Sequence, residues 1–166
     1  MDARHDQAPL CPEGDFRFWT GVGAGALALL AIATVLGFGA PADLLPRLSL
    51  AAAHVTWAAL CAVAGAAGIA AVALVRVRPA GAAADILARS LACCGVASLV
   101  QLVPIGTPAL KVSFDALAFV SVAAVLARAA FRIPTLDAFA ACAVGAGVLG
   151  AVAAAARLVT WAAAPG

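Results

Sequence analysis

The stretch VPIGTP, residues 103–108, decides how many times this chain crosses a membrane. It interrupts an apolar region, residues 86–128, that would otherwise form one helix about 64 Å long at 1.5 Å per residue. The hydrocarbon core of a bilayer is only about 30 Å thick, so one span needs about 20 residues. Pro104 and Gly106 break the helix, and Pro108 suits the first turn of a new one. The region therefore contains two spans rather than one.

The composition of the whole chain is that of a membrane protein. Its 166 residues are 66% hydrophobic and 11% charged, with a mean hydropathy of +1.10. Soluble domains carry about 25% charged residues. The net charge is only +2 and no basic face is clustered, so nucleic acid is not an expected partner. Nine arginines against one lysine, with abundant alanine and glycine, are typical of a GC-rich bacterial genome. We predict a multi-pass protein of the bacterial inner membrane, in contact with the lipid bilayer.

Five apolar segments are long enough to cross the bilayer, so we expect an all-α integral membrane protein, a bundle of five transmembrane helices. The predicted spans are residues 18–39, 48–75, 86–103, 109–128 and 136–159. They make one transmembrane domain, residues 18–161, between an amino-terminal tail, residues 1–17, and a short carboxyl-terminal tail, residues 162–166.

The basic residues predict an orientation. One side carries Arg4, Arg17, Arg76, Arg78, Arg128 and Arg132, with Arg89 at its border, and the other carries Arg47, Lys111 and Arg157. Because arginine and lysine are enriched in cytoplasmic loops, we place the amino terminus in the cytoplasm and the carboxyl terminus outside. Trp19, Trp57 and Trp161 agree, since each lies near an end of a span, where tryptophan is enriched.

The charged residues lie at the ends of the predicted spans. Lys111 and Asp115 are four residues apart, a spacing that lets them pair on one helical face. No charge remains near the bilayer centre, where a proton relay or a coupled-ion site usually leaves one. The pattern therefore disfavours secondary active transport.

One polar stripe runs along the third span. Ser90, Cys94, Ala97 and Gln101 follow spacings of four, three and four, which place them on one helical face. The stripe can be a groove for a small polar ligand or a metal. It can also be a seam between helices, where polar groups bond across and small ones allow close approach. The sequence favours the seam.

A second candidate face lies on the second span, where His54 and Cys61 are seven residues apart. A histidine there could ligate haem or a metal, but haem usually needs a second axial ligand. The other histidine, His5, lies in the amino-terminal tail. Because His54 is expected near the outer interface beside Trp57, we interpret it as an interfacial residue.

The remaining chemistry is sparse. The cysteines, Cys11, Cys61, Cys93, Cys94 and Cys142, are odd in number and four lie inside apolar segments, so we expect small buried side chains rather than disulfides. The chain has no zinc-protease spacing, phosphate loop or serine nucleophile turn, and its loops are too short for a soluble catalytic domain. We predict no enzyme activity, cofactor or bound metal.

Small residues at a spacing of four mark two candidate packing faces. Gly21 and Gly25 form one on the first span, and Ala143, Gly147 and Ala151 form the other on the fifth. Such faces gain packing energy only against another helix. We therefore expect the fifth span to lie against protein, either in the bundle centre or at a subunit interface.

Two functions follow from these patterns. The sequence favours a packing protein, an accessory subunit, assembly factor or scaffold that forms a homo- or hetero-oligomer through its transmembrane helices. The alternative is a binding or permeation protein for a small ligand or a soft metal, which would use His54, Cys61, Ser90, Cys94 and Gln101.

Overall fold

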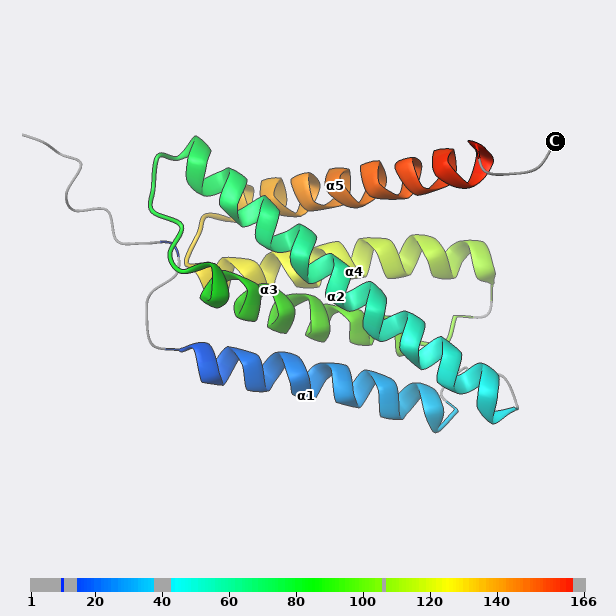
Figure 1. Cartoon of the computed structure of the whole chain (residues 1–166). Helices are drawn as coiled ribbons and strands as arrows, with labels where there is room; N and C mark the ends of the chain where they lie inside the picture. The colour runs from blue at the N-terminus through cyan, green and yellow to red at the C-terminus, as the bar shows by residue number, and fades with distance from the viewer. Residues whose placement is uncertain (1–9, 11–14, 38–42, 106, 163–166) are drawn as a thin grey trace, which may run out of the picture.

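The computed structural model describes residue 10 and residues 15–37, 43–105 and 107–162. Within these ranges lie α1 (Phe16–Val35), α2 (Leu44–Val75), α3 (Ala83–Ser98), the 3-10 helix η1 (Leu99–Leu102), α4 (Pro108–Phe131) and α5 (Thr135–Ala162) (Figure 1). Most of both predicted tails, with His5 and Cys11, lies outside the described residues.

The helices confirm the all-α fold with five segments long and apolar enough to cross a membrane. The third segment is α3 continued by η1, Ala83–Leu102. Helical structure stops at Leu102 and resumes at Pro108, with the proline in the first turn of α4. The described residues 103–105 and 107 therefore lie between two helices, as the sequence predicts.

The helices alternate in direction along the bundle (Figure 1). In the described chain α2 and α3 contact each other, and α1 packs against both. On the other side α4 contacts α3, α5 contacts α2, and α4 and α5 contact each other. Among the described residues the backbone of α2 does not closely approach that of α4, nor does α3 closely approach α5. Side chains fill part of the space between these four helices, where Phe119 and Leu149 pack against Cys61 and Cys94.

Glycine allows two pairs of helices to approach closely. A Cβ on Gly23 would lie 3.1 Å from the backbone nitrogen of Ala92, so α1 and α3 touch there through their backbones. A Cβ on Gly68 of α2 would overlap the backbone carbonyl of Ala141 in α5. On Gly145 of α5 it would lie 3.0 Å from the carbonyl oxygen of Ala64. Backbone contact of this kind is typical of packed transmembrane helices.

The two packing faces predicted from the sequence are not the ones that these contacts use. Gly21 and Gly25 are exposed, and nothing lies within 4 Å of a Cβ built on either. Ala143, Gly147 and Ala151 are also exposed on α5, which packs against α2 through other residues. Within this chain the α5 face therefore does not point to the bundle centre. The other expected location, a subunit interface, stays a prediction.

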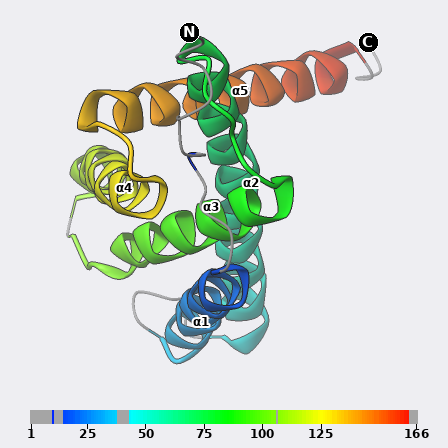
Figure 2. The ribbon, with the colours of Figure 1, turned by 90° about the vertical axis from the view of Figure 1, so that its left-hand side faces the viewer.

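An ion pair fixes the first turn of α5 to the end of α2. Arg76 donates from Nε to Asp137 Oδ2 over 3.1 Å and from Nη2 to Asp137 Oδ1 over 2.6 Å. Hydrogen bonding to this carboxylate, and its charge, raise the pKa of Arg76, so the arginine stays protonated. From this anchored end α5 runs across α2 and away from α4 (Figure 2).

A buried arginine joins three helices at the same end of the bundle. Arg89 of α3 is only 3% exposed and donates to the backbone carbonyl of Ala130 in α4. Its guanidinium lies 5.4 Å from the ring centre of Trp19 in α1 and 3.9 Å from a carboxylate oxygen of Asp15. Cation–π and hydrogen-bond contacts of this kind stabilise a charge that would be costly in hydrocarbon.

Candidate functional site: a cavity between four helices

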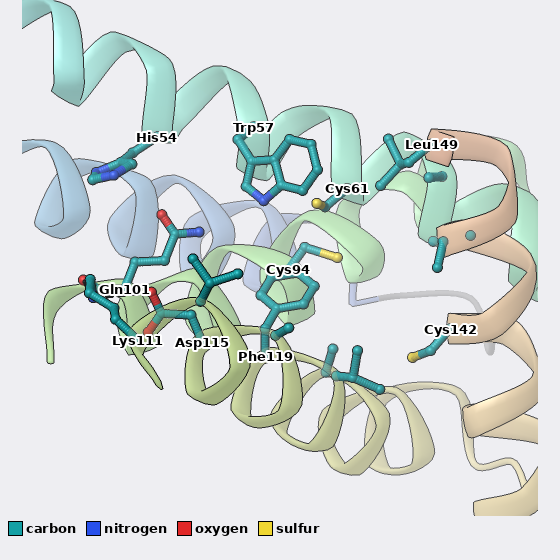
Figure 3. Close-up of a pocket in the computed structure, with 18 of the residues that line it drawn as sticks. His54, Trp57, Cys61, Cys94, Gln101, Lys111, Asp115, Phe119, Cys142 and Leu149 are labelled. Atoms are coloured by element: carbon teal, nitrogen blue, oxygen red, sulfur yellow. Dashed lines mark hydrogen bonds and ion pairs between the residues drawn. The ribbon is translucent and has the colours of Figure 1, made fainter. Parts of the chain in front are cut away.

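A cavity of about 960 Å³ fills the space between α2, α3, α4 and α5. Small-molecule sites range from about 300 to 1,000 Å³, so this one is large. Its polar and sulfur-bearing lining residues are His54, Cys61, Cys94, Gln101, Lys111, Asp115 and Cys142, and its larger apolar ones include Leu50, Trp57, Phe119 and Leu149 (Figure 3).

The sequence explains why side chains do not fill this space. Where the helices face the cavity, α2 contributes Ala64 and Gly65, and α5 contributes Gly145, Ala146 and Gly150. Residues as small as Ala146 and Gly150 leave room on the α5 side of the cavity, whereas Gly145 lies directly against the backbone of Ala64.

The structure brings together four of the five ligand-face candidates from the sequence. His54 and Cys61 reach the cavity from α2, Cys94 from α3 and Gln101 from η1. The fifth, Ser90, lies beside a separate pocket of about 30 Å³ next to Cys94. Its Oγ is buried and has no hydrogen-bond partner among the described residues.

Sequence reasoning missed the residues that α4 and α5 add to this site. The spacing of Lys111 and Asp115 predicted their ion pair, and the structure shows it at 3.0 Å. What the spacing could not show is that this pair lines the same cavity as His54 and Gln101. For Phe119, Cys142 and Leu149, no signal in the sequence distinguishes a cavity wall from an ordinary packed or lipid-facing surface.

Lys111 uses its whole hydrogen-bonding capacity inside the protein. Its Nζ lies 3.0 Å from Asp115 Oδ2, 3.0 Å from the backbone oxygen of Gln101 and 3.1 Å from that of Val103. A lysine ammonium has three N–H donors, and these three acceptors account for them. The two carbonyls belong to the end of η1 and the residue after it, where helical carbonyls lack partners within the helix.

Asp115 keeps one oxygen unpaired. Oδ2 pairs with Lys111, but Oδ1 is buried and accepts no hydrogen bond from any residue that the structure describes. Leaving a buried polar atom unsatisfied costs about 1–3 kcal/mol, and more for a charged group. Such an oxygen beside a cavity is a position where a bound donor gains the most.

The hydrogen bonds of Thr34 determine how His54 is oriented. Thr34 Oγ1 lies 2.8 Å from the backbone oxygen of Leu30 and 3.3 Å from His54 Nδ1. A hydroxyl has one hydrogen and a carbonyl can only accept, so the threonine donates to Leu30. Nδ1 of His54 therefore donates to Thr34, and in the neutral ring Nε2 remains as an acceptor.

Away from these polar groups the cavity is apolar. Cys61 and Cys94 are buried, Cys142 is half-buried, and Phe119 and Leu149 pack beside the first two. A free thiol in such surroundings behaves as a small hydrophobe. In the described ranges no three histidine, cysteine or acidic residues lie close enough together to hold a metal ion. The cavity thus has one polar end and one apolar end (Figure 3).

Comparisons of this chain with family models, with curated proteins and with solved structures found no match.

Proposed function

We propose that this membrane protein binds a small, mainly apolar molecule in the cavity between α2, α3, α4 and α5. One observation carries the proposal: residues from all four helices and from η1 line a single space of about 960 Å³. Binding sites of this type are concave and mostly apolar, with a few polar groups that fix orientation. Lys111, Asp115, Gln101 and His54 supply those groups here.

The bilayer is the expected source of the ligand. An apolar molecule concentrates in the membrane, and α5 diverges from α4 along its length (Figure 2), so we propose that the ligand enters between these two helices. The polar residues lie near the start of α2 and of α4, close to one membrane surface. A bound molecule would keep its polar part at that surface and direct its apolar part towards Cys61 and Cys94.

Trp57 provides a direct test, because it lines the cavity. We expect 1-bromodecane to quench its fluorescence saturably when the full chain is reconstituted in phosphatidylcholine nanodiscs. Trp57→Phe should remove the saturable component and so identify its source. Ala146→Phe, on the cavity wall, should abolish saturation as well. Ala28→Phe, on the exposed face of α1, is the matched control and should not. Quenching that rises linearly with probe in every variant would contradict the proposal.

A second candidate is a packing protein, an accessory subunit, assembly factor or scaffold. Its support is the exposed face of Ala143, Gly147 and Ala151 on α5, since nothing lies within 4 Å of a Cβ on Gly147. This face would contact another copy of the chain or a different membrane protein. The two functions are compatible, because the cavity and this face use different residues.

The distribution of arginine supports a location for either function. The ends of α2 and α4 lie next to Arg76, Arg78 and Arg132, and the start of α1 includes Arg17. We propose that this end faces the cytoplasm of a bacterial cell and that the chain resides in the inner membrane. The polar end of the cavity would then face outward.

A further inference from the structure

The charged groups at the cavity's polar end indicate the ligand, because the cation Lys111 is already paired while the acid Asp115 keeps an oxygen without a partner among the described residues. The inference rests on the proposed binding function, and it adds the chemical class of the bound molecule.

Lys111 is the cationic side chain in the lining, and it would be the natural partner of an anionic ligand. Its three N–H groups are, however, directed at Asp115 Oδ2 and at the backbone oxygens of Gln101 and Val103. An incoming carboxylate or phosphate would have to displace one of these acceptors. It would also approach the negative charge of Asp115, which carries an unpaired oxygen of its own.

The hydrogen-bond acceptors at the polar end of the cavity can be identified in the same way, from the partners that each group already has. Asp115 Oδ1 is buried without a donor among the described residues. His54 gives its Nδ1 hydrogen to Thr34, which leaves Nε2 as the acceptor of the neutral ring. The Gln101 carboxamide also lines the cavity, and it adds a neutral acceptor oxygen together with two neutral N–H donors.

The apolar lining residues indicate what the ligand is like beyond its polar head. Beyond these residues the lining consists mainly of aliphatic, aromatic and thiol side chains, among them Cys61, Phe119 and Leu149 (Figure 3). A molecule that satisfies both ends has an apolar body and a head that donates hydrogen bonds.

We propose that the cavity binds an apolar molecule with a primary amine or hydroxyl head, and that it selects against carboxylates and phosphates. The head donates to the Asp115 carboxylate, whose side chain is 22% exposed, and the apolar body extends towards Cys61 and Cys94. An amine and a hydroxyl share this donor chemistry, and the experiment separates them.

The test compares three probes of equal chain length on the full chain in phosphatidylcholine nanodiscs at neutral pH. The probes are 11-bromoundecan-1-ol, 11-bromoundecan-1-amine and 11-bromoundecanoate, each measured by saturable quenching of Trp57 and expressed per lipid. A hydrogen bond to a charged group contributes about 1.5–3 kcal/mol. The alcohol or the amine should therefore reach half-saturation at a probe-to-lipid ratio about ten-fold lower, or more, than the carboxylate does. Tighter binding of the alcohol or of the amine identifies which donor the site takes.

Asp115→Ala tests the cause of this preference. The substitution removes the unpaired acceptor and releases one N–H of Lys111, so the order of affinities should reverse in favour of the carboxylate. Asp43→Ala is the matched control, because Asp43 is an exposed acid at the same end of the bundle and outside the lining. It should leave the order unchanged.

The outcomes separate the two proposals. If the wild-type chain binds the carboxylate as tightly as the alcohol and the amine, the donor-head inference is overturned and the cavity remains a binding site. If no probe, including 1-bromodecane, saturates, the binding function fails and this inference fails with it. The wild-type comparison decides the matter even where Asp115→Ala does not fold.

Discussion

Arg76 and Asp137 form a two-pronged ion pair, with N–O distances of 3.1 and 2.6 Å, between the residue that follows α2 and the first turn of α5. The carboxylate is largely buried, with its side chain 11% exposed, while the arginine side chain is 52% exposed. The pair joins two helices that lie 61 positions apart in sequence at this point. It fixes the end of α5 that lies furthest from the polar part of the cavity.

We expect Asp137→Asn to lower the thermal stability of the chain in nanodiscs. An amide cannot provide the charge or the two acceptor oxygens that the guanidinium binds here. Asp43→Asn, at an exposed acid that caps nothing through its side chain, is the control and should not change stability. Equal melting temperatures for the wild type and Asp137→Asn would show that the pair does not anchor α5.

The glycine contacts predict opposite effects for two identical substitutions. Gly68→Ala should destabilise the chain by about 1–3 kcal/mol, because the new methyl group meets the rigid backbone of Ala141 and must push α5 away. Gly21→Ala should leave stability equal or slightly higher, since its methyl group meets nothing within 4 Å and alanine favours helix. Chemical denaturation in detergent measures both. A tolerated Gly68→Ala would mean that α2 and α5 are not in backbone contact.

The exposed face of α5 predicts a change in assembly. We expect Gly147→Leu to leave the folded chain intact, because a Cβ at this position meets no neighbour, and to disrupt oligomers that use the face. Ala28→Leu on the exposed side of α1 should affect neither property. Native mass spectrometry and thermal stability measure the two effects. An unchanged assembly in Gly147→Leu would indicate that this face contacts lipid.

Orientation can be tested with reporter fusions. Fusions after Arg78 and Arg132 should report a cytoplasmic location, and fusions after Pro46 and Thr107 an external one, because arginine is retained on the cytoplasmic side. An external signal after Arg132 would contradict both the orientation and the number of spans that precede it.

The number and approximate positions of the helices could be predicted from the sequence, because the thickness of the bilayer sets the length of a span. Apolar segments of about 20 residues predict spans by themselves, and two prolines and a glycine in residues 103–108 separate the third from the fourth. The positions of Cys94 and Gln101 on one face also follow from helical spacing alone. These features depend on residues within one helix.

The cavity and the contacts between helices depend on residues from different helices, which spacing does not reveal. Gly21 and Gly25 have the same small-residue spacing as many packed faces, yet the contact of α1 with α3 is made at Gly23. The same is true of α5, where Gly145 and Ala141 meet α2 while Gly147 does not. Alanine and glycine are so frequent in this chain that several faces of each helix look suitable for packing.

The anchoring of α5 also gives the molecule a mechanical property. The helix has 28 residues, about 42 Å at 1.5 Å per residue, and its ion pair and glycine contacts lie in its first half. Because only the first half of α5 is fixed by these contacts, a small rotation of the helix there produces a large displacement at its carboxyl-terminal end. The part of α5 beyond Ala141 extends 21 residues to Ala162, about 32 Å, so a tilt of about 5° would move its far end by about 3 Å. Such a tilt would change the separation of α5 from α4 while the backbone contact of Gly68 with Ala141 stays in place.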